Sequence, residues 1–286
     1  MRQHRLVLCT PDRVLSPVVE SVWATIRHEA AGVVNREPVL ARLIDGTVLH
    51  HDCFAESLID CLTRRLAVPE LDAWTLAEVF RCAFDDESAL IDAAASDLQA
   101  IRDRDPACPD LLTPLLYFKG YQALQAHRIT HQLWLQDKIH LARHLQSRVS
   151  EVFGIDIHPA ARMGRGILID HATGLVIGET AVVEDDVSIL QGVTLGGTGK
   201  DTGDRHPKIR RGVLLGAGAT VLGNIEVGEG AKVGAGSIVL SPVEPYTTVV
   251  GVPARPVGPR LTSPAALSME QCMDMDQRLG APPTGS

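Results

Sequence analysis

The 286-residue chain lacks several features that would assign it to common protein classes. It has no apolar run near the ~20 residues of a membrane-spanning helix, so we expect no membrane association. The short apolar stretch near the N-terminus is too brief for a secretory signal. The six cysteines show no Cys-x-x-Cys spacing, which disfavours a disulfide framework or a zinc site and favours reduced thiols in the cytoplasm.

Positive charge is also scarce. The chain has 27 Lys and Arg against 35 Asp and Glu, which gives a formal net charge of −8 and a sequence pI near 5.7. Proteins that bind nucleic acid usually carry a basic face. We therefore expect no nucleic-acid partner.

Aromatic residues make up only 4% of the chain, and their distribution divides it into two regions. Of the 11 aromatic residues only Tyr246 lies beyond Phe153, whereas 22 of the 25 glycines do. The two regions should therefore pack differently and meet near Gly154.

The second region has a large aliphatic residue at every sixth position. The main series is Ile177, Val183, Ile189, Leu195, Ile209, Leu215, Val221, Val227, Val233 and Val239. An earlier series, at Ile157, Met163, Ile169 and Leu175, has the same period but is offset by two residues. Neither a helix nor a lone strand has this period, but the coils of a hexapeptide β-helix do. We predict a left-handed parallel β-helix over residues 154–260 and a flexible tail over 261–286.

One interruption of the repeat is long. After Leu195 the next aliphatic residue of the series arrives only at Ile209, so the loop 196–208 holds eight residues more than the repeat needs. The narrow interior of such a prism must be filled by apolar side chains. Functional groups should therefore lie at the corners, on the outer faces and in this loop.

The first region, residues 1–153, is expected to be an all-helical domain. Apolar residues recur at three- and four-residue intervals through 111–152, which indicates an amphipathic helix, with Thr113 as its cap and Pro114 at its first position. Shorter helices are expected around residues 16–31, 54–66, 75–85 and 88–102.

Two pairs of histidines, His127/His131 and His140/His144, have the spacing of metal ligands on one helix face. A third ligand or an intervening Glu is missing from both pairs. We assign them to packing or to contact with solvent, and expect no metal.

Polar residues at the β-helix corners are the candidates for chemistry. Asp156 and His171 are 15 residues apart, close to one coil of ~18, so they could be neighbours on adjacent coils. A carboxylate beside an imidazole fixes its tautomer and raises its basicity. Asp170 precedes this histidine, and Arg205 and His206 lie in the long loop.

Several segments together resemble the serine O-acetyltransferase family over roughly residues 75–277. They are Arg104-Asp-Pro-Ala, Thr113-Pro-Leu-Leu-Tyr-Phe-Lys-Gly-Tyr, Phe153-Gly-Ile-Asp-Ile-His-Pro-Ala-Ala, Asp170-His-Ala-Thr-Gly, Gly192-Val-Thr-Leu-Gly-Gly-Thr-Gly-Lys, Gly203-Asp-Arg-His-Pro-Lys, Gly251-Val-Pro-Ala-Arg and Met273-Asp-Met-Asp-Gln. The repeat alone would imply only the wider hexapeptide acyltransferase superfamily.

The resemblance implies transfer of acetyl from acetyl-CoA to the hydroxyl of L-serine, the first step of cysteine synthesis from serine. By that resemblance His171 is the general base and Asp156 orients it. Asp105 and Asp170 would hold the substrate ammonium, and Arg205 with His206 the carboxylate. Anions at one end and cations at the other suit an amino acid.

The resemblance also implies where acetyl-CoA would bind. Small corners at Ala217 and Ala235 would admit the pantetheine arm, and Thr198 is a family-matched contact. A backbone N–H near Gly197 is the candidate donor to the thioester oxyanion, and Arg255 is assigned to the CoA phosphates.

Members of the family form trimers with active sites between neighbouring prisms, and pairs of trimers through the helical domain. A homotrimer or a dimer of trimers is therefore expected. Family members often bind O-acetylserine sulfhydrylase through a C-terminal isoleucine. This chain ends Gly280-Ala-Pro-Pro-Thr-Gly-Ser without one, which puts that partnership in doubt for this chain.

Other functions on the same prism are open. One is an acyltransferase for a sugar or another small acceptor, although a sugar needs neither Asp105 nor Arg205. Another is a zinc enzyme like the γ-class carbonic anhydrases, which needs three converging histidines; this region has only His158, His171 and His206. An inactive scaffold is a third.

Overall fold

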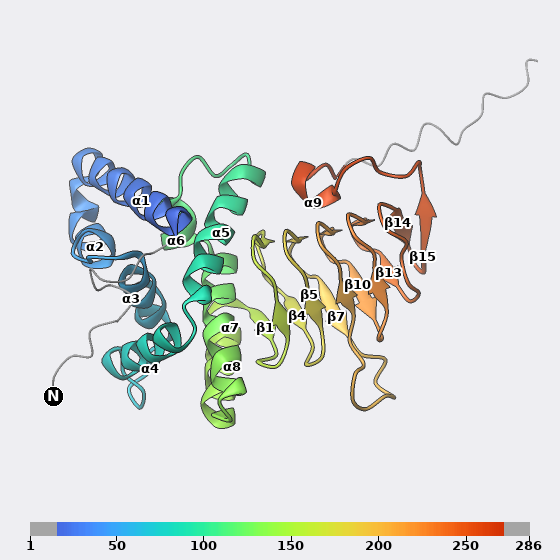
Figure 1. The fold of residues 1–286 in the computed structure, drawn as a ribbon, viewed down its shortest axis with the longest axis horizontal. Coiled ribbons are helices and arrows are strands. Elements are labelled where there is room, and N and C mark those ends of the chain that lie inside the picture. The colour runs from blue at the N-terminus through green and yellow to red at the C-terminus, as the bar shows by residue number, and fades with distance from the viewer. Residues whose placement is uncertain (1–15, 272–286) are drawn as a thin grey trace, which may run out of the picture.

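Residues 16–271 are described by a computed structural model, in which a helical domain is followed by a parallel β-helix (Figure 1). The helices of the first part are α1 (Pro17–Arg36), η2 (Pro38–Leu40), α2 (Ala41–Ile44), η3 (Asp45–Leu49), α3 (Phe54–Leu66), α4 (Ala73–Asp86), α5 (Ala89–Arg104), α6 (Leu112–Tyr117), α7 (Lys119–Leu135) and α8 (Ile139–Phe153). Gly154 ends α8 in the left-handed conformation (φ 69°) that glycine adopts most easily.

The amphipathic segment 111–152 forms three helices, α6, α7 and α8, instead of one. Asp110 Oδ1 accepts a hydrogen bond from the N–H of Thr113 (2.7 Å), so the prediction that Thr113 caps the helix is wrong. The chain leaves helical geometry at Phe118 (φ −83°, ψ 105°). The buried Gln122 carboxamide then donates to the last carbonyls of α6, which would otherwise lack partners.

The strands wind into three parallel sheets, and each of the first four turns of the chain contributes one strand to each sheet. The first sheet contains β1 (Ile155–Ile157), β4 (Leu175–Ile177), β7 (Thr194–Gly196), β10 (Thr220–Leu222) and β13 (Ile238–Val239). The second contains β2 (Arg162–Met163), β5 (Val182–Val183), β8 (Lys208–Ile209) and β11 (Glu226–Val227). The third contains β3 (Leu168–Ile169), β6 (Ser188–Ile189), β9 (Leu214–Leu215), β12 (Lys232–Val233), β14 (Thr248–Gly251) and the antiparallel β15 (Ala254–Val257). A helical domain followed by a parallel β-helix is confirmed.

The register of the sheets locates both irregularities of the sequence repeat. Successive inward residues pair as Ile157 with Ile177, Ile177 with Leu195, and Leu195 with Val221. The coils between them are therefore 20, 18 and 26 residues long. Compared with 18, the first has two extra residues, which fall at the corner 170–174, and the third has eight, which fall in the loop 196–208.

A buried ion pair joins the two domains. Asp97 of α5 is fully buried and Arg128 of α7 is 6% exposed; Arg128 Nη2 donates to Asp97 Oδ2 at 2.7 Å. The same carboxylate accepts from the backbone N–H of Ile167 (2.9 Å), and Arg128 donates to the carbonyls of Met163 and Gly164. Both charges thus hold the first coil of the β-helix against the helices.

Helix α7 approaches the first coil closely. A Cβ on Gly120 would lie 2.2 Å from the carbonyl oxygen of Ile169, so this contact requires glycine. His127 Nε2 lies 3.2 Å from the Ala161 carbonyl and His131 Nδ1 2.7 Å from the Pro159 carbonyl. The assignment of this histidine pair to packing is confirmed.

The C-terminal segment differs from the flexible tail predicted over 261–286. Its described part, 261–271, packs on the third sheet and contains α9 (Ala265–Ser268), which lies over the β-helix in Figure 1. Ala266 is fully buried, and its N–H donates to the Gly212 carbonyl (3.0 Å). The alanines fit against the flat sheet, which the compositional argument overlooked. Residues 272–286 lie outside the described residues, as does the Met273 motif.

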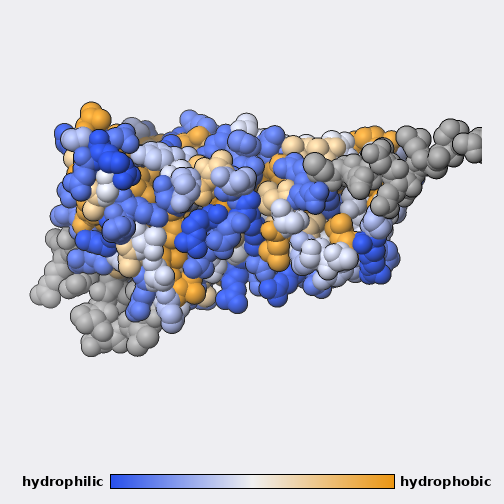
Figure 2. Space-filling view, turned by 90° about the horizontal axis from the view of Figure 1, so that it is seen from above, coloured by the Kyte–Doolittle hydropathy of each residue, from blue (hydrophilic) through white to orange (hydrophobic). Residues whose placement is uncertain are grey.

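Two further expectations can be compared with the described residues. Cys61, Cys82 and Cys108 are free thiols, but Cys53 is disulfide-bonded, so the expectation of reduced cysteines is wrong for Cys53. Among residues 16–271 no helix is long and apolar enough to cross a membrane. On the face shown in Figure 2, apolar patches are separated by polar side chains.

Breaking the buried ion pair should destabilise the protein strongly. We expect Asp97→Ala to lower the free energy of unfolding by about 3–5 kcal/mol, because the Arg128 guanidinium would remain buried without its partner. Urea denaturation measures the loss. The control is Arg64→Ala, which removes an ion pair with Asp60 that is half exposed at the arginine and should cost less than about 1 kcal/mol. Equal losses in the two variants would contradict the role of Asp97.

Stability should fall in mild acid through His127. Burial lowers the pKa of His127 from its ordinary 6.5 to about 3. Between these values the unfolded chain binds a proton that the folded chain does not, so this contribution is complete above about 6.5 and is lost as the pH falls toward 3. We expect His127→Gln to reduce the slope of unfolding free energy against pH in this range. The reduction should correspond to the uptake of up to one proton fewer on unfolding. An unchanged slope would show that His127 does not contribute.

Candidate active site

The two extra residues of the first coil lie at the corner between β3 and β4, where Asp170 and His171 stand. His171 and Ala172 have positive φ angles (53° and 64°), a backbone conformation that residues other than glycine rarely adopt. Backbone strain of this kind is found mainly at functional sites. The corner turns the His171 ring outward, so that 76% of its side chain is exposed, with Nε2 3.8 Å from Asp170 Oδ1.

A cavity of about 360 Å³ opens beside this corner. It is bounded by the α5–α6 connection, the start of α7 and the end of β3, and its lining includes Asp105, Tyr117, Lys119, Asp170 and His171. The structure therefore brings together three of the residues that the sequence singled out, Asp105, Asp170 and His171, from segments 65 residues apart in the chain.

The electrostatics of this cavity favour a cation. Burial raises the pKa of Asp170, the nearby His171 lowers it, and the negative charge of Asp105 raises it further. Two carboxylates that repel each other would both be stabilised by an ammonium group placed between them. Asp105 is held in place because its Oδ1 accepts a hydrogen bond from the N–H of Ala107 (2.8 Å).

Two residues of this cavity were missed by the sequence reasoning. Lys119 Nζ donates to Thr173 Oγ1, which ties the start of α7 to the corner. Tyr117 is half exposed at the end of α6. Both lie inside one of the family-like segments, but no spacing or charge pattern distinguished them.

Asp156 has a partner other than His171 in the single chain. It lies in β1, in register with Val176 of β4, and its Oδ1 accepts a hydrogen bond from Gln146 of α8 (2.7 Å). Among the described residues no hydrogen bond joins Asp156 and His171. Its role as the residue that orients His171 stays a prediction.

Arg205 and His206 occupy a different edge of the prism. They lie near the end of the long loop, between the first and second sheets, whereas His171 lies between the third and first sheets. Arg205 Nη2 contacts Glu179 Oε2 at 2.6 Å, and the Thr180 hydroxyl accepts from the N–H groups of Arg205 and His206. A single chain therefore does not combine these residues with the cavity at His171.

The position of His206 depends on a glycine. A Cβ on Gly178 would lie 2.0 Å from His206 Cδ2, so any other residue would displace the ring. Burial, then the charge of Arg205, lowers the pKa of His206, which favours a neutral imidazole that can donate one hydrogen bond. Glu179, Thr180 and Gly178 were not identified from the sequence, because their importance depends on contact with a distant loop.

The corners proposed for acetyl-CoA continue the edge that carries His171. Hydrogen bonds link successive corners along it: Gly192 N–H to the Thr173 carbonyl, Gly218 N–H to Gln191, and Gly236 N–H to Ala217 (2.9, 2.8 and 2.8 Å). Ala217 and Ala235 thus lie in line with His171.

An apolar cavity of about 410 Å³ adjoins this edge, and Ala235 and Val250 help to line it. Arg255 is paired in register with Val250 and is exposed at this end of the β-helix. Gly197 and Thr198 lie in the long loop on the other edge, where Thr198 Oγ1 donates to Asp201 (2.8 Å). The structure therefore brings Ala217, Ala235 and Arg255 to one side and leaves Gly197 and Thr198 on another.

Within one chain, the histidines needed for a zinc enzyme do not converge. His158 packs edge-on against Trp134, with ring centroids 5.1 Å apart, while His171 and His206 occupy separate edges. Within residues 16–271, no group of three His, Cys, Asp or Glu side chains is placed to hold a metal ion.

The sequence matches two family models and several known proteins. The family model described as the N-terminal domain of serine acetyltransferase matches residues 22–126, and the bacterial transferase hexapeptide model of six repeats matches 206–241. The chain is 55% identical over 260 residues to the serine acetyltransferase of Salmonella typhimurium, covering 91% of this chain and 93% of that protein.

Solved structures agree as well. A serine acetyltransferase in complex with CoA has a TM-score of 0.81 and 53% identity, over 84% of this chain and all of that one. The Neisseria gonorrhoeae serine acetyltransferase in complex with serine has a TM-score of 0.81 and 51% identity, over 82% and 97%. The resemblance noted in the sequence is confirmed: the chain belongs to the serine acetyltransferase family.

Proposed function

We propose that this chain transfers the acetyl group of acetyl-CoA to the hydroxyl of L-serine, giving O-acetyl-L-serine and CoA. The observation that carries the proposal is the cavity where Asp105, Asp170 and His171 meet at the head of the edge formed by Ala217 and Ala235. This arrangement places His171, as the base, between the two carboxylates that would bind an ammonium group and the edge along which CoA would lie. Relatives bound to serine and to CoA support both substrates.

The reaction needs one proton to move twice. His171 would accept the proton of the serine hydroxyl as the oxygen attacks the thioester carbonyl, a contribution of about 10²–10⁴-fold. The tetrahedral intermediate then collapses, the carbon–sulfur bond breaks, and the CoA sulfur takes the proton from the imidazolium. Because Gly197 and His171 lie on different edges of one prism, the proposed donor to the oxyanion is a backbone N–H near Gly197 of a neighbouring copy.

The carboxylate end of serine is assigned to Arg205 and His206 of a neighbouring copy. These residues and His171 lie on opposite edges of the first sheet, so one chain cannot present them to one substrate. The outer face of that sheet carries Val176, which is 40% exposed, and Thr194, Thr220 and Ile238. A flat face of β-branched side chains is suited to packing against other copies, which supports a trimer with sites between prisms.

Three finer points stay predictions. They are the pairing of trimers through the helical domain, the cytoplasmic location, and whether O-acetylserine sulfhydrylase is a partner. The segment that bears on the last point lies outside the described residues.

Replacing the proposed base should abolish turnover without affecting the acyl carrier. We expect His171→Asn to lower kcat by at least about 100-fold, because asparagine cannot accept the proton. Calorimetric titration with CoA should give an unchanged Kd, since the corners at Ala217 and Ala235 remain intact. Near-normal turnover in this variant would remove His171 from the mechanism.

A site shared between copies predicts complementation. His171→Asn and Arg205→Ala chains with different affinity tags are co-expressed, and mixed trimers are purified through both tags. Each mixed trimer contains one interface with an intact His171 and an intact Arg205, so activity at low serine should return to about a third of wild type. Mixed trimers no more active than the two parents would place both residues in a single-chain site.

A further inference from the structure

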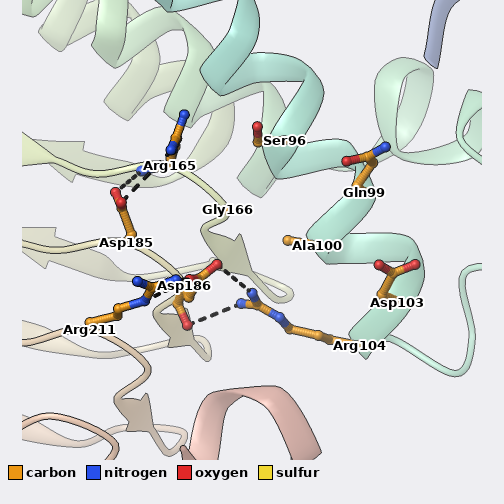
Figure 3. A pocket seen from close by; sticks show the side chains of 10 residues that line it. All are labelled: Ser96, Gln99, Ala100, Asp103, Arg104, Arg165, Gly166, Asp185, Asp186 and Arg211. Atoms are coloured by element: carbon orange, nitrogen blue, oxygen red, sulfur yellow. Dashed lines mark hydrogen bonds and ion pairs between the residues drawn. The ribbon is translucent and has the colours of Figure 1, made fainter. Parts of the chain in front are cut away.

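A third cavity lies on the other side of the end of α5, outside the candidate active site (Figure 3). It has a volume of about 330 Å³ and lies where α5 meets the corners between the second and third sheets. The charged residues that line it are Arg104, Arg165, Arg211, Asp103, Asp185 and Asp186. Three guanidinium groups and three carboxylates balance one another, so the cavity shows no preference for a charged ligand.

Arg104 is the buried member of this group. Its side chain is 6% exposed, and it extends from the last turn of α5 toward Asp186 (Figure 3). Nη1 donates to the Asp186 carbonyl and to Ser188 Oγ, and Nη2 donates to Asp186 Oδ1, each at 3.3 Å. A buried guanidinium must keep such partners, so the last residue of α5 is fixed to the corner before β6.

Asp186 is itself held for this contact. Its backbone has a positive φ (59°), and Oδ2 accepts from Arg211 Nε and Nη2 (3.0 and 2.7 Å). A Cβ on Gly166 would lie 2.6 Å from Asp186 Oδ1, so the neighbouring coil leaves room for the carboxylate only because it has glycine there. The carboxylate is thus fixed between two guanidinium groups.

Both carboxylates of the candidate active site are positioned from the same strand. Arg104 donates a hydrogen bond to Ser188 of β6, and Asp105 directly follows Arg104 in the chain. On the other side, the N–H of Asp170 donates to the carbonyl of Ile189, also in β6 (2.8 Å). Strand β6 therefore sets the separation of Asp105 from Asp170.

We propose that Arg104 is a positioning residue for the substrate ammonium, acting through Asp105. This inference rests on the proposed function, in which Asp105 and Asp170 hold that ammonium. Without the contact to Asp186 and Ser188, the end of α5 could move by a fraction of an ångström, and the two carboxylates would no longer fit one cation. Misplacement on that scale is enough to reduce binding and rate by an order of magnitude or more.

Kinetics of an Arg104 series tests the proposal. We expect Arg104→Ala to raise the serine KM about tenfold while the acetyl-CoA KM stays unchanged. Arg104→Lys should recover part of the loss, because an ammonium can reach one of the three acceptors. The matched control is Arg165→Ala, which lines the same cavity but is 68% exposed and lies 3.9 Å from Asp185; it should behave as wild type.

A double-mutant cycle separates positioning from a general loss of structure. If Arg104 acts through Asp105, then Arg104→Ala combined with Asp105→Asn should be no worse for serine than Asp105→Asn alone. Losses that multiply would overturn the proposal, as would an Arg104→Ala serine KM equal to that of wild type.

Arg211→Ala provides a second route if Arg104→Ala does not fold. Arg211 is 65% exposed, so its removal frees the Asp186 carboxylate without burying an unpaired charge. A smaller rise in serine KM is expected, and no rise would count against the proposal that Asp186 and Arg104 position Asp105. An unchanged serine KM in Asp105→Asn would instead refute the proposed role of Asp105, and this inference with it.

Discussion

The geometry of the candidate site depends on the buried ion pair between Asp97 and Arg128. An isolated charge in a protein interior costs several kcal/mol, so each group must keep its partner. Burial raises the pKa of Asp97, and the charge of Arg128 and the surrounding donors oppose that shift. Because the pair also bonds the backbone of the first coil, the helices cannot slide on the β-helix without exposing or unpairing a charge. The cavity between α5, α7 and the β3–β4 corner is therefore rigidly framed.

The chemistry resides where the repeat is broken. A regular coil of 18 residues presents apolar side chains inward and tight corners outward, with little room for reactive groups. The two extra residues at 170–174 turn His171 out of the corner, and the eight extra residues at 196–208 place Arg205 and His206 beyond the opposite edge. The regular coils between them supply only the small corners that a long, thin acyl carrier needs.

Much of the fold follows from the sequence because the interior of a prism accepts few residue types. A strict six-residue aliphatic period therefore predicts the coils. Breaks in that period show where residues have been inserted. The helical domain was harder to predict, because the backbone leaves helical geometry at Phe118 and again at Asp137 (φ 60°), which divides one amphipathic stripe into three helices. No apolar pattern reveals these breaks. The described part of the C-terminal segment, 261–271, packs through small alanines, which carry little hydrophobic signal.

The candidate site was predictable only in part. The corner residues Asp170 and His171 stood out by residue type, the family resemblance added Asp105, and the structure places all three around one cavity. The residues that support them, such as Glu179 beside Arg205, act through contacts between distant segments and leave no trace in local sequence.

The measurement that tests the central claim is release of CoA from acetyl-CoA with L-serine, compared with 3-hydroxypropionate, which lacks the ammonium group. Rapid release with serine and a loss of at least about 100-fold with the analogue is the predicted result, because the two carboxylates would be left without their cation. Equal rates with the two acceptors, or release with neither, would contradict the account.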